Sequence, residues 1–167
     1  MAKLEILTYP NPILLARARV VARVTLPIQR LAHDMLETMY PAAGIGLAAP
    51  QVGVQKRVIV VDVGEGPLVL VNPTISAAEG EQLGLEGCLS LPGLVGEVRR
   101  AAWVTVNGLN SQGRPVRLEG EGLLARVLQH EIDHLDGILF VARVEDLTRL
   151  WKVSDLSATV AKEVAHI

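Results

Sequence analysis

The stretch QHEIDHLDG, residues 129–137, carries two histidines and a glutamate at the end of the strongest helical pattern in the chain. His130 and His134 are one helical turn apart, and Glu131 shares their face of the helix. Two neutral imidazoles can bind a divalent metal ion, and the carboxylate beside them can relay a proton to and from metal-bound water. The competing interpretation is a pair of surface histidines on a charged helix, because H-E-x-x-H also arises by chance.

The helix that carries this stretch is predicted over residues 121–135, EGLLARVLQHEIDHL, with Gly137 as the left-handed residue that ends it. An N-terminal amphipathic helix is predicted over residues 25–40, where Thr25 can cap the first turn. Residues 146–167 have helical composition, so a C-terminal helix is expected there.

Strands are predicted for the β-branched segments between and after these helices. RVIVVDV and LVLVN come first, with a break at Asn72-Pro73, and WVTVNGL and PVRLEG form a hairpin with Gly113 near its tip. ILFVARV, residues 138–144, is predicted to form one more strand. Strands and helices do not alternate regularly, so the predicted fold class is α+β with antiparallel sheets, in preference to a parallel α/β fold.

The composition of the chain suits a single globular domain and argues against a membrane-spanning or nucleic-acid-binding protein. The 167 residues are 50% hydrophobic, which suits one domain over residues 1–167. A net charge of -2 gives no general attraction to nucleic acid or anionic lipid. Neither a signal peptide nor an apolar run of about 20 residues is visible, so we expect a cytoplasmic protein without a membrane span. Cys88 is the single cysteine, which excludes an internal disulfide.

A catalytic metal site needs a third ligand besides the two histidines. The metzincin pattern H-E-x-x-H-x-x-G-x-x-H fits through Gly137 and then fails, because Phe140 stands where the third histidine belongs. Thermolysin-like enzymes use a downstream glutamate, but beyond the nearby Glu145 the chain offers only Glu163, which is poorly placed for a rigid ligand. A third ligand is therefore expected upstream of His130.

Cys88, in the segment EGCLSLPG, is the remaining candidate. A thiolate is a strong metal ligand, and two histidines with one thiolate leave the fourth tetrahedral position open for chemistry. A lone cysteine is by itself more often a small buried side chain. The incomplete two-histidine face favours Cys88 as the third ligand.

The Gly-rich segment GIGLAAPQ, residues 44–51, is a third feature. Its small residues permit a ligand or another backbone to approach closely, and the amide of Gln51 can donate a hydrogen bond. The simpler interpretation is a tight turn between a loop and a strand. Neither G-x-G-x-x-G nor G-K-[ST] is present, so nucleotide binding is unsupported.

Together the three segments resemble the peptide deformylase family, whose signatures are G-x-G-x-A-A-x-Q, E-G-C-L-S and H-E-x-x-H in this order. The resemblance covers nearly the whole chain. Every fixed position is filled, by Gly44, Gly46, Ala48, Ala49 and Gln51, by Glu86, Gly87, Cys88, Leu89 and Ser90, and by His130, Glu131 and His134.

The resemblance implies a hydrolase that removes the formyl group from N-formylmethionine at the start of nascent polypeptides. It implies antiparallel β-sheets packed around a central metal-binding helix, and one Fe(II) per chain that nickel, cobalt or zinc can replace. Carried over by motif position, the metal ligands would be Cys88, His130 and His134. Glu131 would act as general base and then as general acid, while Gln51 and the backbone N–H of Leu89 would stabilise the oxyanion.

Substrate binding is expected to add an extended peptide to exposed backbone edges, with little demand on its later side chains. The methionine side chain would enter an apolar pocket assigned by family position. The residues expected to contact substrate are Gly44, Ile45, Gly46, Glu86, Gly87, Leu123, Arg126 and Val127.

The resemblance also bears on partners and location. Relatives can dock on the ribosome through a C-terminal helix, although the balanced charge of this segment does not indicate it. We expect a monomer in the bacterial cytoplasm, with an organellar setting the less favoured alternative. By family analogy, Arg100 is expected to pair with Asp133 and anchor the metal helix, against the alternative of two unconnected surface charges.

Two rival interpretations remain open. The first is an H-E-x-x-H endopeptidase, which differs in its third ligand, so that Cys88→Ala should abolish metal binding only in a deformylase. The second is a deformylase-like protein that retains metal or peptide binding without catalysis, against which the complete set of site residues argues.

Overall fold

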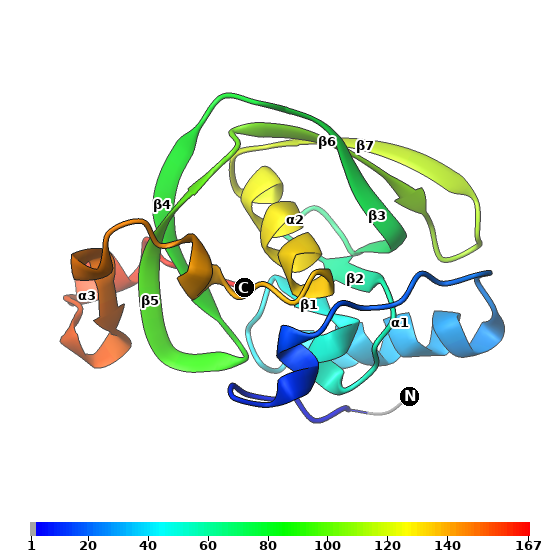
Figure 1. Ribbon diagram of the computed structural model, residues 1–167, viewed down its shortest axis with the longest axis horizontal. Helices are drawn as coiled ribbons and strands as arrows, with labels where there is room; N and C mark the ends of the chain where they lie inside the picture. Colours follow the sequence, from blue (N-terminus) through cyan, green and yellow to red (C-terminus); the bar gives the residue numbers. More distant parts are fainter. Residues whose placement is uncertain (1–2) are drawn as a thin grey trace.

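A computed structural model describes residues 3–167 and shows helix α2 enclosed between two β-sheets (Figure 1). The first sheet has five antiparallel strands in the order β1 (Gly46–Ala48), β2 (Val58–Val61), β3 (Leu68–Glu79), β6 (Trp103–Leu109) and β7 (Pro115–Glu121). The second sheet has four strands in the order β8 (Leu150–Lys152), β5 (Leu91–Arg100), β4 (Gln82–Cys88) and β9 (Ala165–His166).

The helices are α1 (Leu26–Met39), α2 (Gly122–Leu135) and the short α3 (Ala158–Ala161). Single turns of 3-10 helix complete the chain: η1 (Pro12–Leu15), η2 (Ala49–Val52), η3 (Phe140–Arg143), η4 (Leu147–Arg149) and η5 (Val153–Asp155). No helix in residues 3–167 combines the length and the apolar character that crossing a membrane requires.

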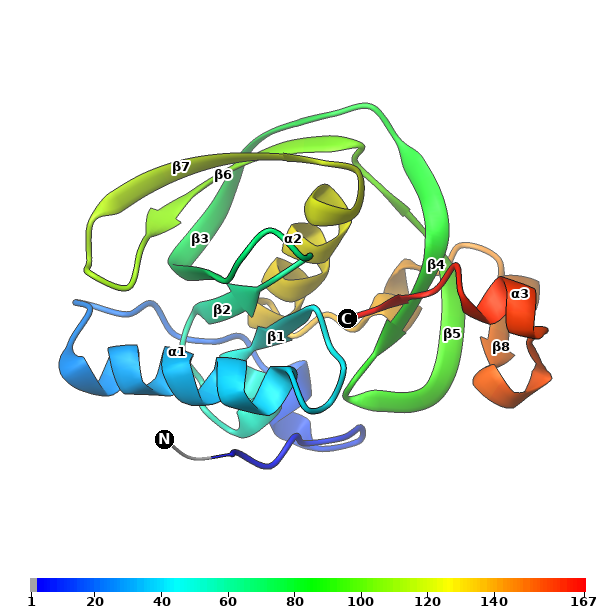
Figure 2. The ribbon, with the colours of Figure 1, turned by 180° about the vertical axis from the view of Figure 1, so that it is seen from behind.

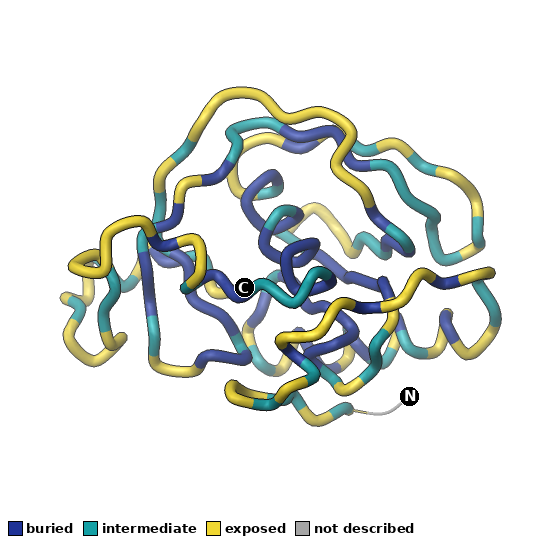
Figure 3. The backbone as a smooth tube through the Cα atoms, viewed as in Figure 1, coloured by how far each residue is buried: buried dark blue, intermediate teal, exposed yellow. Residues whose placement is uncertain are grey.

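The five-stranded sheet is covered on both faces. In β2, Val58 and Val60 pack in the cluster around α1, while Ile59 and Val61 pack in the cluster around α2. This alternation follows from strand geometry, because successive side chains point to opposite faces. Burial is densest along α2 and the strands that face it (Figure 3).

Helix α2 ends as predicted. Gly137 has φ +75°, its N–H donates to the carbonyl of His134, and the N–H of Ile138 donates to the carbonyl of Asp133. These two bonds satisfy carbonyls that the helix leaves free, in the pattern known as a Schellman motif. A Cβ at Gly137 would lie 2.6 Å from the carbonyl oxygen of Leu15, so the N-terminal segment rests directly on the end of α2.

The α+β fold class and the antiparallel hairpin of β6 and β7 are confirmed. The break predicted at Asn72-Pro73 is wrong, because β3 continues through it as a bulge. Asn72 takes φ +51°, and its side chain exchanges two hydrogen bonds with the backbone of Val21. One pair of strands, β4 and β9, is parallel.

The strand predicted for residues 138–144 is wrong, since this segment contains η3. Leu139, Phe140 and Val144 are all buried in one cluster beneath the second sheet, a spacing that does not alternate as a strand requires.

The long C-terminal helix predicted over residues 146–167 is also wrong. Asp146 caps one 3-10 turn, Ser157 caps the four-residue α3, and the segments around α3 join the two edges of the second sheet as β8 and β9. The edge strands of a sheet have backbone groups without partners. Here residues of the C-terminal segment pair with those groups, and this pairing outweighs the helical preference of their side chains.

Candidate active site

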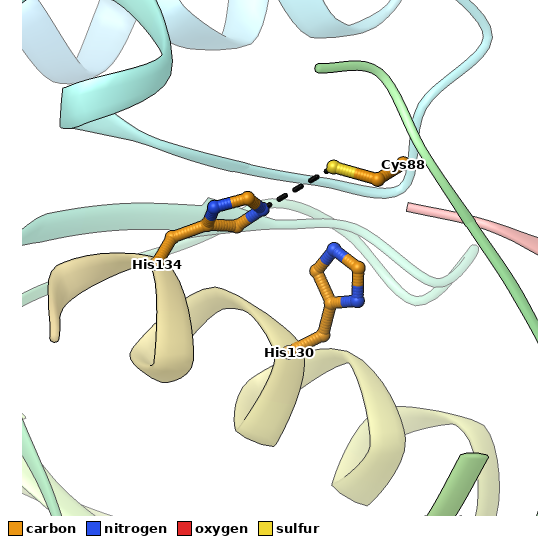
Figure 4. Close-up of side chains that lie close together, drawn as sticks. All are labelled: Cys88, His130 and His134. Atoms are coloured by element: carbon orange, nitrogen blue, oxygen red, sulfur yellow. Dashed lines mark hydrogen bonds between the residues drawn. The ribbon is translucent and has the colours of Figure 1, made fainter. Parts of the chain in front are cut away.

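The three predicted metal ligands meet in one buried cluster. Cys88 ends β4, while His130 and His134 project from α2 toward it (Figure 4). Their ligand atoms all lie within 4.8 Å of one another, and Cys88 Sγ is 3.4 Å from His134 Nε2. All three side chains are buried.

The donor chemistry of this cluster fits a divalent metal ion. His130 Nδ1 faces Glu86 at 2.8 Å, and the buried Nε2 atom has no hydrogen-bond partner among residues 3–167. Burial lowers the pKa of His134 well below its usual range, so this ring is neutral, as a ligand must be. Burial, followed by the charge of Glu131, raises the pKa of the Cys88 thiol to about 12. A nearby cation would supply the charge that a thiolate at this position needs.

Glu86 is the centre of a buried charge network. Its carboxylate is fully buried and accepts two hydrogen bonds of 2.9 Å from Arg100, a third from Arg126 and a fourth from His130 Nδ1–H. Burial acts to raise the pKa of Glu86, but the hydrogen bonds from Arg100 and His130 outweigh it and hold the pKa well below its usual range. An ionised Glu86 fixes the tautomer and orientation of His130.

The pair predicted between Arg100 and Asp133 is present, and it ties β5 to α2. Arg100 Nη1 donates to Asp133 Oδ2 at 2.6 Å, and Asp133 also accepts two hydrogen bonds from Arg143. The network therefore connects the helix that carries both histidines to the sheet that carries Cys88.

Glu131 lies beside the three ligands in a contrasting environment. Both carboxylate oxygens are buried and have no hydrogen-bond partner within residues 3–167. Burial, followed by the charge of Glu86, raises the pKa of Glu131 well above its usual range. A Cβ at Gly46 would lie 2.5 Å from Glu131 Oε2, so the second glycine of GIGLAAPQ makes room for this carboxylate.

Gln51 is fully buried at the edge of the cluster. Its Oε1 accepts from the N–H of Ala48 at 2.9 Å, and its Nε2 donates to Ser90 Oγ at 3.0 Å and faces Cys88 Sγ at 3.7 Å. The amide predicted to contact the oxyanion is thus held toward the cluster by Ser90. The backbone N–H of Leu89 donates to the carbonyl of Ile167 at 3.0 Å.

The residues predicted to contact substrate fall into two groups. Gly44, Ile45, Gly46 and Gly87 belong to two segments that flank the cluster, because Gly46 faces Glu131 and Gly87 precedes Cys88. The N–H of Ile45 donates to the carbonyl of His166, and the carbonyl of Gly87 accepts from the N–H of Ile167. Val127 is buried in the core next to the partly buried Ile45.

The side chains of Glu86 and Arg126 bond to each other, which leaves only backbone and aliphatic atoms for a substrate. Leu123, at the start of α2, is 46% exposed.

The three positions considered for the third ligand of a zinc protease are Phe140, Glu145 and Glu163, and none of them adds a ligand to the cluster. Phe140 is buried and stacks on His130 with ring centroids 6.2 Å apart, so it supports the ligand ring. Glu145 is an exposed partner of Arg99, and Glu163 is exposed next to α3.

Sequence reasoning missed two features of the site. One is the hydrogen bond from His130 to Glu86, whose signal was an acidic residue two positions before the cysteine in a segment with many glycines. The other is β9, which no local pattern indicates.

Comparisons with known proteins agree with this geometry. The family model for polypeptide deformylase matches residues 3–150. A peptide deformylase of Desulfitobacterium hafniense is 56% identical over 149 residues, which cover 89% of this chain and 99% of that protein. The crystal structure of a peptide deformylase from Synechococcus elongatus in complex with actinonin matches with a TM-score of 0.85 and 44% identity, over 89% of this chain and 86% of that one. The crystal structure of peptide deformylase from Thermus thermophilus matches with a TM-score of 0.83 and 49% identity, over 87% and 88% of the two chains. The chain therefore belongs to the peptide deformylase family.

Proposed function

We propose that this chain removes the formyl group from N-formylmethionine at the N-terminus of nascent polypeptides, with one Fe(II) ion held by Cys88, His130 and His134. The observation that carries the proposal is the meeting of these three ligand atoms within 4.8 Å, next to the buried and unpartnered carboxylate of Glu131. Family membership supports the reaction and the substrate.

A bound divalent ion would lower the pKa of a coordinated water and polarise the formyl oxygen. Iron is favoured by the family resemblance, and the Cys-His-His set would also accept nickel, cobalt or zinc. Glu86 would keep the Nε2 lone pair of His130 directed at the ion by holding the proton on Nδ1.

Glu131 would move the proton. It would take a proton from the attacking water and pass it to the nitrogen as the bond between the formyl carbon and nitrogen breaks, giving formate and a free amino terminus. The raised pKa of Glu131 suits a group that must both accept and release a proton near neutral pH.

Gln51 Nε2 and the N–H of Leu89 would donate to the formyl oxygen, which becomes the oxyanion when water adds to the formyl carbon. Such donors act most strongly when they are already oriented before reaction, and the hydrogen bond from Gln51 to Ser90 provides this orientation.

The substrate backbone would add as a short strand between the segment around Ile45 and the segment around Gly87. Both segments present backbone groups at the edge of the cluster. Val127, Ile45, Leu123 and the aliphatic part of Arg126 would form the pocket for the methionine side chain.

We also place this enzyme, as a monomer with one domain over residues 1–167, in the bacterial cytoplasm. The contacts of both sheets with α2 support a single domain, and the relatives named above are bacterial. A ribosome contact, if made through the C-terminal segment, would use the region around α3, a helix of four residues.

The test is formate release from formyl-Met-Ala-Ser by protein purified without oxygen. We expect release that a chelator abolishes and that Fe(II), Ni(II) or Co(II) restores. Cleavage of an internal bond in the unformylated peptide, with no formate under any of these metals, would instead establish an endopeptidase. The variant Cys88→Ala should lose metal binding.

A further inference from the structure

The segment after α3, Val164–Ile167, enters the space beside the metal cluster. It runs along β4 toward β1, as the views from both sides show (Figures 1 and 2). Ala165 and His166 pair in parallel with Glu86 and Gly87 of β4. This segment lies outside residues 3–150, which the family model matches.

The backbone bonds of this segment use the groups assigned above to the substrate. The N–H of Leu89 donates to the carbonyl of Ile167 at 3.0 Å, and the N–H of Ile45 donates to the carbonyl of His166 at 3.3 Å. The N–H of Ile167 donates to the carbonyl of Gly87 at 3.3 Å. The N–H of Leu89 is the proposed oxyanion contact. The N–H of Ile45 and the carbonyl of Gly87 belong to the two segments proposed to bind the substrate backbone.

The side chain of Ile167 completes the overlap. It is fully buried and packs in the same core cluster as Val127 and the partly buried Ile45, which are two of the residues proposed to line the methionine pocket. His166, which precedes it, is exposed. An apolar side chain in the pocket, with backbone bonded on both sides, is the arrangement expected of a bound peptide.

We propose that Val164–Ile167 is an internal competitor that fills the substrate groove and must leave before a formylated peptide can bind. The proposal rests on the proposed function, because it is that function which assigns Ile45, Gly87 and Leu89 to the substrate. The segment is suited to leaving: β9 has only two residues, and the exposed Lys162 and Glu163 connect it to the four-residue α3.

A competitor of this kind changes apparent affinity and leaves the chemical step alone. If the open groove is populated about one tenth of the time, the apparent affinity for a peptide is about tenfold weaker than that of the open form. Releasing the segment should therefore lower the KM for formyl-Met-Ala-Ser by about tenfold with kcat unchanged.

The test compares three full-length variants with the unmodified chain. Ile167→Asp places a charge in the apolar pocket and should release the segment. Ile167→Val, the matched control, keeps the anchor and should keep the KM of the unmodified chain, and the exposed Lys162→Ala should do the same. Equal KM values for Ile167→Asp and the unmodified chain, with formate released by both, would overturn the proposal.

A second measurement needs no turnover. Amide hydrogen exchange in the unmodified chain should be slower than in an unfolded peptide at Ile45, Leu89 and Ile167, by about tenfold if the open groove is populated one tenth of the time. Saturation with the product peptide Met-Ala-Ser should speed exchange at Ile167 and leave Ile45 and Leu89 protected. Continued protection of Ile167 with peptide bound would overturn the proposal, even if Ile167→Asp fails to fold. Formate release by none of the chains would overturn the proposed function instead, and the exchange result would still decide whether peptide displaces the segment.

Discussion

Glu86 and Glu131 are both fully buried, yet their surroundings differ completely. Glu86 accepts hydrogen bonds from Arg100, Arg126 and His130, whereas Glu131 has no protein partner among the described residues. Burial pushes both pKa values upward, but partners reverse the shift at Glu86 and nothing reverses it at Glu131. The hydrogen bonds around Glu86 hold it ionised beside His130, whereas the surroundings of Glu131 favour its protonated form.

Depth of burial alone therefore does not assign a role to an acidic residue. The charges and hydrogen-bond donors around it decide whether it holds structure or takes part in chemistry. Substitutions at each carboxylate and its neighbours can test this distinction.

The largest effect is expected for Glu131→Gln on turnover. Loss of the proton carrier should reduce formate release by roughly 10²–10⁴-fold. The free energy of unfolding should stay the same or rise, because a neutral amide replaces a buried and unpaired carboxyl group. Steady-state formate assays and urea unfolding measure the two quantities. Glu79→Gln, on an exposed part of β3, is the control and should change neither.

Glu86→Gln should affect stability and metal retention. Two buried guanidinium groups lose their carboxylate, which typically costs about 3–5 kcal/mol of unfolding free energy. Metal affinity should fall by roughly 10–100-fold, because His130 loses the acceptor that orients it. Urea unfolding and competition with a chromogenic chelator provide the measurements.

Glu97→Gln is the matched control for Glu86→Gln, since Glu97 pairs with Arg149 at the surface. Its loss should cost about 0–1 kcal/mol. Equal effects of the two substitutions would contradict the distinction drawn between them.

Arg100 and Arg143 both donate to Asp133, but we expect their substitution to differ in its effect on metal retention. Arg100 is buried and also binds Glu86, so Arg100→Ala should weaken metal retention by about tenfold. The side chain of Arg143 is 47% exposed, so Arg143→Ala should cost about 0–1 kcal/mol and leave metal retention intact. Chelator competition on both variants decides this, and unchanged metal affinity in Arg100→Ala would show that the network does not anchor the helix.

The smallest effect on stability is expected for the hydrogen bond between Tyr40 and the surface carboxylate of Asp62. Tyr40 Oη–H donates to it at 2.7 Å, and this hydrogen bond raises the pKa of Tyr40 from 10.0 to about 12. Because the pKa is raised in the folded state, the pair stabilises the fold below pH 10 and loses this contribution as pH rises toward 12. Ultraviolet titration of tyrosinate should show a component near pH 12 that Tyr40→Phe removes. A Tyr40 midpoint at pH 10 would exclude the bond.

The metal cluster and its helix could be predicted from the sequence because their signals are local or chemically restricted. Helical spacing places His130, Glu131 and His134 on one face, and the failure of the pattern at Phe140 left Cys88 as the ligand. Phe140, at the position of the missing third histidine, is buried and stacks on the ring of His130.

The C-terminal segment could not be predicted in the same way. Residues 146–167 have helical composition, but their conformation depends on the two edges of a sheet formed by residues far away in sequence. The hydrogen bond from His130 to Glu86 has the same difficulty, since it requires knowing that β4 passes beside α2. A contact between two residues that are far apart in sequence leaves little signal in the sequence pattern around either of them.

The contact between Gly137 and Leu15 ties the N-terminal segment to the end of α2, one turn beyond His134. The carbonyl of Leu15 occupies the space of the missing side chain at Gly137, and Ala18 donates to the carbonyl of Leu135 at 2.8 Å. The last turn of α2, which carries His134, is therefore held by residues that come far earlier in the chain. We expect a truncation that removes this contact to loosen the turn that carries His134. Preparations compared for metal content should share one N-terminal sequence.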